Sequence, residues 1–210
     1  MIPGNFHRLF VNALTLSRVP FIFAFTVAAV AAECTRSLVA AVCACVFMLV
    51  AGLSDLFDGL LARRWGVVSS FGKLADPLMD KVFFIVSFPT LLWLIGIQGE
   101  NIVHGVVMLA FTVLYILRDQ WVTFLRAVAS TYHADVSAMW LGKVRTALSF
   151  PAAGLIYFYL AFHGLFPAQV DYWFLVSVYA VEGGLILLNV YSCVVYTRAY
   201  WPYLMMALRS

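Results

Sequence analysis

The stretch SDLFDGLLARRWGVVSSFGKLADPLMDK, residues 54–81, places four aspartates between two long apolar runs. They are Asp55, Asp58, Asp76 and Asp80, four of only ten acidic residues in a chain that is 64% hydrophobic. A carboxylate beside hydrocarbon is costly, at roughly 2.5–3.5 kcal/mol even on the membrane-insertion scale. The concentration of aspartates at one place therefore indicates a functional site.

The composition around this stretch is that of an integral membrane protein. Mean hydropathy is +0.97, only 11% of residues are charged, and apolar runs long enough to cross a bilayer recur along the chain. We expect an all-α fold with a short N-terminal interfacial helix and six membrane-spanning helices, in a single domain over residues 1–210. The expected spans are about 10–32, 37–62, 77–98, 102–130, 143–164 and 170–197.

Basic residues are distributed unevenly between the two sides of these spans. Cytoplasmic loops of membrane proteins carry an excess of Lys and Arg. One side holds Arg36, whereas the side that carries the aspartates holds Arg8, Arg63, Arg64, Lys73, Lys143, Arg145, Arg198 and Arg209. We therefore expect a protein of the inner (cytoplasmic) cell membrane, with both termini and the aspartates facing the cytoplasm. A net charge of +3 is too small to predict nucleic-acid binding.

The spacing of the aspartates places them on two helical faces. One face, on the helix that continues the second span, holds Asp55, Asp58, Gly59 and Ala62. The other, at the start of the third helix, holds Gly72, Asp76 and Asp80. Converging carboxylates repel one another, and an oxygen-only ligand set favours Mg²⁺, Mn²⁺ or Ca²⁺ as the neutralising cation. Such paired metals typically bind a phosphate chain, which the small residues would admit and Arg63 or Arg64 would contact.

Two other interpretations remain open on spacing alone. The first is a solvated loop whose acidic residues are neutralised by neighbouring basic residues. The second is the ion pathway of a divalent-cation transporter, which would prefer the bilayer midplane and broken helices of two related repeats. The aspartates lie at the end of a span and no repeat is visible, which favours a metal-assisted reaction.

The pattern Asp55-x-x-Asp58-Gly59-x-x-Ala62-Arg63, eight residues, then Gly72-x-x-x-Asp76-x-x-x-Asp80, resembles the complete signature of the CDP-alcohol phosphotransferase family. The resemblance implies a six-helix membrane fold, usually a homodimer, with two Mg²⁺ or Mn²⁺ ions at a site open to the cytoplasm. It implies that the four aspartates hold the metals and that Asp80 also acts as general base. It further implies a CDP pocket lined by Gly59, Ala62, Arg63 and Gly72.

Three other stretches resemble one branch of this family, the CDP-diacylglycerol–glycerol-3-phosphate 3-phosphatidyltransferases. They are NALTLSRVPFIF at 12–23, LRDQWVTFLR at 117–126 and WLGKVRTALSF at 140–150. The branch usually has Arg-Glu in place of Arg118-Asp119, and Lys in place of Arg145. The first stretch adds Asn12 and Thr15 to the CDP-binding residues. Arg18 follows at the same spacing of three, although an arginine there could equally extend to the lipid interface.

Basic residues near the fourth and fifth spans favour an anionic acceptor. Arg118 and Arg126 lie on one side of the fourth helix, and Lys143 and Arg145 lie near the start of the fifth. A phosphate-bearing acceptor needs such donors, whereas a neutral alcohol does not. The alternative for Arg118 is a buried pair with Asp119.

The expected reaction transfers the phosphatidyl group of CDP-diacylglycerol, a membrane lipid, to glycerol 3-phosphate, giving phosphatidylglycerol phosphate and CMP. Within the family, the acceptor could instead be an inositol phosphate or serine, or a CDP-alcohol could react with diacylglycerol. Four histidines, His7, His104, His133 and His163, are interpreted as interfacial polar residues. Glu182 in the sixth span has no assigned role.

Overall fold

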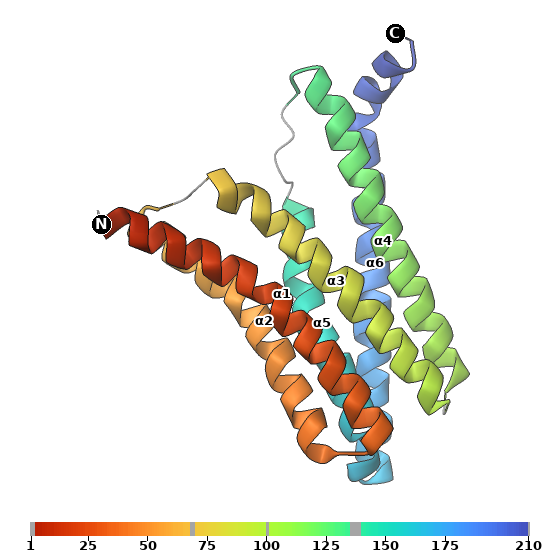
Figure 1. Ribbon diagram of the computed structural model, residues 1–210. Helices are drawn as coiled ribbons and strands as arrows, with labels where there is room; N and C mark the ends of the chain where they lie inside the picture. Colours follow the sequence, from red (N-terminus) through yellow and green to blue (C-terminus); the bar gives the residue numbers. More distant parts are fainter. Residues whose placement is uncertain (1–2, 68–69, 100, 135–139, 210) are drawn as a thin grey trace. The chain divides into compact units, whose positions relative to one another are not determined.

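The computed structural model describes residues 3–67, 70–99, 101–134 and 140–209, which are helical almost throughout (Figure 1). The elements are α1 (Pro3–Thr35), α2 (Leu38–Trp65), α3 (Ser70–Gln98), α4 (Ile102–Thr131), α5 (Trp140–Phe162), the 3₁₀ turn η1 (His163–Leu165) and α6 (Ala168–Ala207). Six of these helices are long and apolar enough to cross a membrane, and none of the described residues forms a strand. The predicted all-α fold with six spans is confirmed.

The start of α1 differs from the prediction. One continuous helix begins at Pro3, so the N-terminal segment does not form a separate interfacial helix. Proline is tolerated in the first turn of a helix, where its missing N–H has no partner in any case. Residues 5–12 contain no glycine or proline that would interrupt the helix before the span. The first turns of α1 therefore lead into the span without a break, and their interfacial position stays a prediction.

The chain packs into two compact units. The first comprises Met1–Gln98 and Ala153–Phe166, which include α1, α2, α3 and the end of α5. The second comprises Gly99–Ala152 and Pro167–Ser210, which include α4, the start of α5 and α6. The single domain expected over residues 1–210 stays a prediction.

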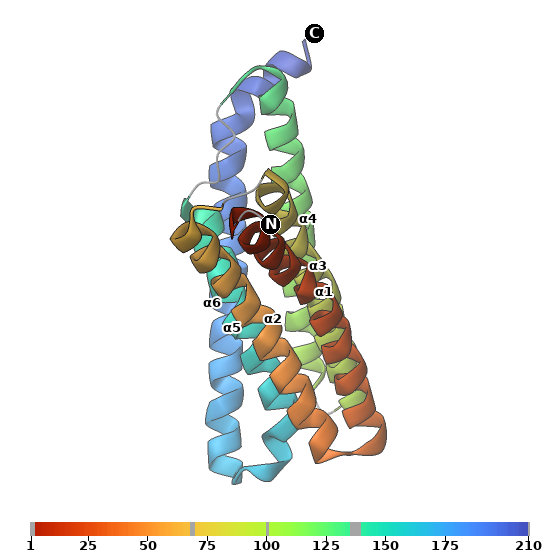
Figure 2. The same cartoon turned by 60° about the vertical axis from the view of Figure 1, so that its left-hand side comes forward.

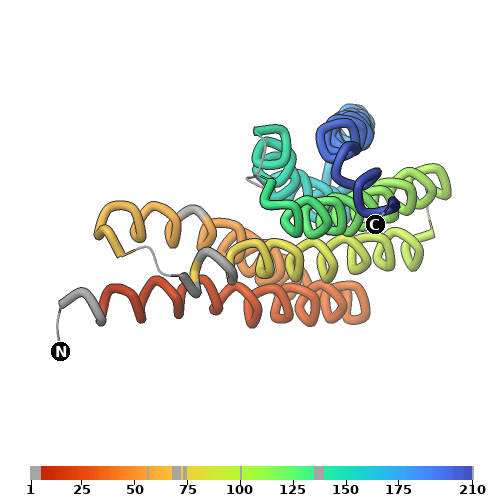
Figure 3. The backbone as a smooth tube through the Cα atoms, turned by 90° about the horizontal axis from the view of Figure 1, so that it is seen from above, coloured from red at the N-terminus to blue at the C-terminus, as the bar shows by residue number. Residues whose placement is uncertain are grey.

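In the first unit, α1 packs along both α2 and α3, as can be followed in Figure 2 and Figure 3. The buried face of α2 includes three small side chains, Ala41, Ala44 and Ala51, which allow membrane helices to approach closely. Ser37 caps the start of α2, and Gly66 ends it with a φ of 63° that glycine adopts without strain. The buried stripe of α1 repeats at spacings of four and three residues: Val11, Thr15, Arg18, Ile22, Phe25 and Ala29.

In the second unit, α4 and α6 run side by side. An apolar cluster at one end of this pair contains Val122, Leu125, Ala129, Tyr196 and Tyr200. Elsewhere the buried faces are partly polar, with His104, Thr112 and Arg118 on α4 and Glu182, Asn189 and Ser192 on α6. Buried polar groups in a membrane helix are costly without partners, so the contacts of these residues bear on function.

Candidate functional site

Two polar residues interrupt the buried apolar stripe of α1. Thr15 is 1% exposed and Arg18 is fully buried, in positions that continue the spacing of Ile22 and Phe25. The buried stripe of α2 likewise passes from Ala51 to Ser54 and Asp58. Where α1 meets α2, the apolar interface therefore gives way to a polar layer.

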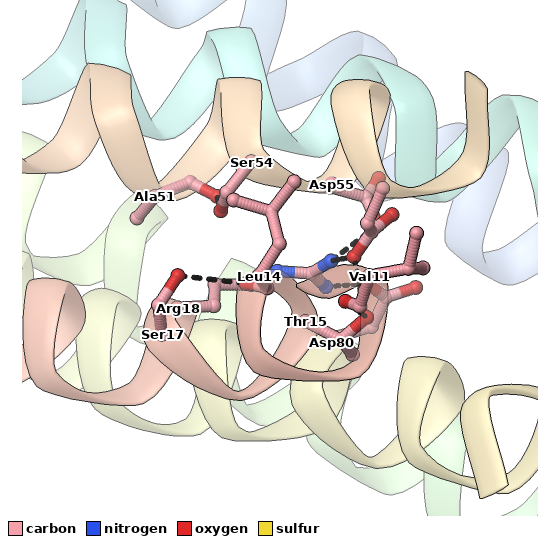
Figure 4. Close-up of polar contacts among 10 residues, drawn as sticks. Val11, Leu14, Thr15, Ser17, Arg18, Ala51, Ser54, Asp55 and Asp80 are labelled. Atoms are coloured by element: carbon pink, nitrogen blue, oxygen red, sulfur yellow. Dashed lines mark hydrogen bonds and ion pairs between the residues drawn. The ribbon is translucent and has the colours of Figure 1, made fainter. Parts of the chain in front are cut away.

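The guanidinium of Arg18 lies among the aspartates (Figure 4). Its Nη1 donates to Asp80 Oδ1 at 2.8 Å, and its Nη2 donates to Asp55 Oδ1 at 2.7 Å and to Asp58 Oδ2 at 3.1 Å. The acidic faces of α2 and α3 thus meet at one side chain of α1. Because Arg18 is completely buried and ion-paired, the alternative that it extends to the lipid interface was wrong.

Thr15 adds a hydroxyl to this group. Its Oγ1 donates to Asp58 Oδ2 at 2.9 Å and also contacts the Val11 carbonyl at 3.2 Å. Asp76 interacts electrostatically with Arg18 and Asp55. We call Asp55, Asp58, Asp76 and Asp80, together with Thr15 and Arg18, the aspartate cluster.

The donor chemistry of the aspartate cluster fits divalent cations. One guanidinium contacts three carboxylates and interacts with a fourth, so the contacts described above leave negative charge in excess. The side chains of Asp55 and Asp80 are 31% and 29% exposed, which gives an ion access to them. In the part of the chain that the structure describes, however, no three acidic, Cys or His side chains converge closely enough to hold an ion. The carboxylates surround Arg18 instead.

The predicted CDP-binding residues lie beside the aspartate cluster in sequence, and their role stays a prediction. Asn12, Gly59, Ala62 and Gly72 are half-buried, Thr15 is buried, and Arg63 is exposed, with its Nε donating to the Gly59 carbonyl at 3.0 Å. A Cβ on Gly59 would lie 3.9 Å from Arg63 Nη2, an ordinary contact. Packing therefore does not require glycine at position 59. The need to leave room for a ligand would explain why glycine is present there.

A second polar group lies in the second unit and involves α4, α5 and α6. Arg145 Nη2 donates to Asp119 Oδ1 at 3.2 Å, and Arg118 Nη1 lies 3.8 Å from the same oxygen. Both arginines are buried, and the Nε of each has no hydrogen-bond partner among the described residues. Within the described part of the chain, two guanidinium groups share one carboxylate, so positive charge is in excess. The expected alternative, a simple Arg118–Asp119 pair, is incomplete because Arg145 binds the same carboxylate more closely.

Three residues of α6 complete this group, and none of them was predicted from the sequence. Arg145 Nη1 donates to Asn189 Oδ1 at 3.5 Å, Arg118 Nη2 donates to Ser192 Oγ, and the Arg118 guanidinium stacks on the Tyr196 ring at 4.9 Å. Arg145 also stacks on the Tyr115 ring, at 4.2 Å. We call Arg118, Asp119 and Arg145, with Asn189, Ser192 and Tyr196, the arginine cluster. The sequence signal that could have found the α6 residues is the spacing of Asn189, Ser192 and Tyr196, three and four residues apart within an apolar run.

Gly142, near the start of α5, packs against Tyr196. A Cβ at this position would lie only 2.8 Å from the Tyr196 hydroxyl, so a larger residue would displace the ring that stacks on Arg118. Of the four predicted acceptor-binding residues, the structure brings together Arg118 and Arg145. Lys143 is exposed on α5 and Arg126 is half-buried on α4.

Glu182 has a partner in the structure. Its Oε1 lies 3.1 Å from His104 Nε2, and both residues are buried. The ring of Tyr179 stands edge-on to His104, with the ring centres 5.4 Å apart. The interpretation of His104 as an interfacial residue was wrong, because a buried carboxylate on α6 holds it inside the helix pair.

The sequence is similar to those of several known proteins. A sequence model described as CDP-alcohol phosphatidyltransferase matches residues 8–188. The chain is 35% identical over 100 residues to a Mycoplasma genitalium CDP-diacylglycerol–glycerol-3-phosphate 3-phosphatidyltransferase, covering 48% of this chain and 38% of that protein. It is 33% identical over 144 residues to a probable phosphatidylglycerophosphate synthase of Mycobacterium tuberculosis, covering 69% and 63%.

A third relative has a different name. A Streptomyces coelicolor cardiolipin synthase (CMP-forming) is 40% identical over 50 residues, covering 24% of this chain and 23% of that protein. The matches thus span less than two thirds of the length of each of these relatives. The family match, in contrast, includes all four aspartates and most of the chain. The chain therefore belongs to the CDP-alcohol phosphatidyltransferase family.

Proposed function

We propose that this protein transfers the phosphatidyl group of CDP-diacylglycerol to glycerol 3-phosphate, giving phosphatidylglycerol phosphate and CMP. Family membership supports the transfer of a CDP-activated group. The relatives named as phosphatidyltransferases and phosphatidylglycerophosphate synthases support this choice of donor and acceptor.

The observation that carries the choice of acceptor is the charge of the arginine cluster. Arg118 and Arg145 are both buried, yet among the residues that the structure describes they share one carboxylate, that of Asp119. Buried excess charge is unfavourable unless a counter-ion binds, and guanidinium groups suit phosphate because they offer paired donors in a plane. Serine or another acceptor without a phosphate would leave this charge uncompensated.

Asp55, Asp58, Asp76 and Asp80 would hold Mg²⁺ or Mn²⁺. When bound, such ions would neutralise charge on the pyrophosphate of CDP-diacylglycerol. The residues of the chain then supply positioning. Gly59, Ala62 and Gly72 would leave room for the nucleotide, and Arg63, which is exposed on the same helix as Gly59, would contact it.

Asp80 would act as the general base. Arg18 contacts one of its oxygens, Oδ1, and its side chain is 29% exposed, so Oδ2 is the oxygen that we assign to the proton. The acceptor hydroxyl gives its proton to Asp80, and its oxygen forms a bond to the phosphorus that carries diacylglycerol. The bond from that phosphorus to the CMP oxygen breaks, and CMP leaves with the electron pair. This chemistry needs no covalent intermediate with the enzyme.

We further propose that the enzyme resides in the inner (cytoplasmic) cell membrane as a homodimer, with both termini and the aspartate cluster on the cytoplasmic side. The six apolar helices support the membrane location. The excess of basic residues near the aspartates supports the orientation.

An acceptor panel tests the reaction. Purified protein in lipid nanodiscs receives CDP-diacylglycerol, Mn²⁺ and, in separate samples, glycerol 3-phosphate, glycerol, serine, inositol phosphate or phosphatidylglycerol, and CMP release is measured. We expect rapid release with glycerol 3-phosphate and little with the others. Release with another acceptor alone would overturn the choice of acceptor. A divalent-cation transporter would move Mn²⁺ into liposomes and release no CMP from any sample.

A further inference from the structure

The first turns of α1 and the last turn of α2 share a group of aromatic rings. The Trp65 ring contacts two rings of α1, with its centre 4.5 Å from that of His7 and 6.0 Å from that of Phe10. Phe6, one turn earlier on α1, stacks on Phe10 with the ring centres 6.5 Å apart. These contacts hold the end of α2 against the start of α1.

Much of this aromatic surface is exposed. Phe6 is 60% exposed, Phe10 45% and Trp65 37%. Two arginines adjacent to these rings in sequence, Arg8 and Arg64, are exposed too, and no carboxylate among the described residues forms an ion pair with either of them. We call this surface the aromatic–arginine patch; it consists of Phe6, His7, Arg8, Phe10, Arg64 and Trp65.

The combination of rings and arginines suits the headgroup region of a bilayer better than water or hydrocarbon. Exposed rings are unfavourable in water, and an arginine is unfavourable in hydrocarbon. At the boundary, aromatic rings lie at headgroup level while arginine side chains reach the lipid phosphates. Arg64 also suits the C-terminal end of α2, where positive charge is favourable, but Arg8 near the start of α1 gains nothing from its helix.

We propose that the aromatic–arginine patch binds the headgroups of anionic phospholipids at the membrane surface. The lipid phosphate meets the two guanidinium groups, and the rings lie beside the upper part of the acyl chains. A zwitterionic lipid offers the same phosphate but carries a compensating positive charge, so it binds more weakly. Thr15 on α1 and Asp58 on α2 are about two helical turns from the patch, so a bound lipid holds the helix ends that carry the aspartate cluster at headgroup level.

The test is a lipid titration that reports on Trp65 alone. The full chain is labelled with 5-fluorotryptophan, purified in a neutral detergent and followed by ¹⁹F NMR, and the Trp65 resonance is identified by its loss in Trp65→Phe protein. Phosphatidylglycerol, phosphatidylcholine with the same acyl chains, and inorganic phosphate are added in separate samples. We expect phosphatidylglycerol to shift the Trp65 resonance at lower concentration than phosphatidylcholine, and inorganic phosphate to leave it unchanged.

Substitution of the arginines separates charge recognition from apolar contact. Arg8→Gln and Arg64→Gln should each raise the midpoint of the phosphatidylglycerol titration about fivefold, and together about 30-fold, while the phosphatidylcholine midpoint changes little. Arg36→Gln is the matched control: it removes an exposed arginine beyond the other end of α1, and both midpoints should stay unchanged. Unshifted resonances of the other tryptophans show that each variant is folded.

Phe10→Ala gives a second test that keeps both arginines. Loss of the exposed ring should weaken the binding of both lipids by a similar factor, because the ring contacts the acyl region that the two lipids have in common. A loss confined to phosphatidylglycerol would show that Phe10 acts only by placing the arginines, and would contradict the role assigned to the rings.

Equal midpoints for the two lipids in wild-type protein would overturn the proposal, because the patch would then make apolar contacts without recognising charge. An unchanged phosphatidylglycerol midpoint in the double arginine variant would overturn it as well. A shift of the Trp65 resonance by inorganic phosphate at the same concentrations would identify a site for free phosphate in place of lipid. Failure of the proposed function has a different signature, namely no CMP release by wild-type protein with any acceptor in the panel.

Discussion

The two polar clusters of this protein have opposite charge imbalances. In the aspartate cluster, one guanidinium meets four carboxylates, three of them in direct ion pairs. In the arginine cluster, two buried guanidinium groups share the carboxylate of Asp119. Charges in a membrane protein are costly unless they are paired, so each imbalance indicates the sign of what the cluster binds. The first suits cations and the second suits an anion.

The largest effect should come from removing a carboxylate of the aspartate cluster. Asp76→Asn keeps the size of the side chain but removes one negative charge, and we expect CMP release to fall by about 10²–10³-fold. The measurement is the initial rate with saturating CDP-diacylglycerol and glycerol 3-phosphate. Asp171→Asn, in the first turn of α6, is the control and should retain activity. Near-normal release by Asp76→Asn would show that the cluster is not the site of the reaction.

The next largest effect should come from the arginine cluster and should appear in the affinity for the acceptor. Hydrogen bonds to charged groups contribute about 1.5–3 kcal/mol, so Arg145→Gln should raise the KM for glycerol 3-phosphate about 10–100-fold. The KM for CDP-diacylglycerol should change little. Arg198→Gln, an exposed arginine on α6, is the matched control. An equal rise in both KM values would contradict a specific role in acceptor binding.

Substitution of Gly142 should disturb the arginine cluster less, and a second substitution should reverse the effect. Gly142→Ala places a methyl group against the Tyr196 hydroxyl, and crowding of this kind costs about 1–3 kcal/mol. We expect a roughly 5–10-fold rise in the KM for glycerol 3-phosphate. Adding Tyr196→Phe should restore much of the loss, because the ring carbon that carries the hydroxyl would lie an acceptable 3.7 Å from the new methyl group. If the double variant is no better than Gly142→Ala, the hydroxyl contact is not the cause.

The smallest effect on activity should come from the buried His104–Glu182 pair, which belongs to neither cluster. Glu182→Gln retains a hydrogen-bonding group but removes the charge beside His104 Nε2. Polar contacts between membrane helices contribute on average about 0.6 kcal/mol, so the thermal midpoint should fall slightly while both KM values stay unchanged. A large loss of CMP release in folded Glu182→Gln protein would assign a functional role to this pair.

Two kinds of feature could be predicted from the sequence: the membrane-spanning helices, from long apolar runs, and the shared helix faces, from the spacing of residues. The apolar runs predicted most of the helix ends to within a few residues. The four-residue spacing of Asp76 and Asp80 predicted that these two aspartates share one face of a helix. The sequence did not predict that α1 begins as early as Pro3, because nothing in the composition distinguishes an interfacial helix from the first turns of a span.

The partners of the buried polar residues were harder to predict. In a membrane helix, the lipid-facing and buried faces are both apolar, so periodicity does not show which way Arg18 points. The contacts of Arg18 with Asp55 and Asp80 also join residues far apart in sequence. The same holds for Ser192 and Tyr196, which belong to the arginine cluster only because α6 packs along α4. Polar residues at helical spacing within an apolar run were the available signal.

One measurement tests the opposite charges of the two clusters together. CMP release from CDP-diacylglycerol is followed with chelator-treated wild-type protein, with or without added Mn²⁺, using glycerol 3-phosphate or glycerol as acceptor. Glycerol has the same attacking hydroxyl but no phosphate. We predict rapid release only when Mn²⁺ and glycerol 3-phosphate are both present. Equal release without a divalent cation would contradict the function of the aspartate cluster, and equal release with glycerol would contradict that of the arginine cluster.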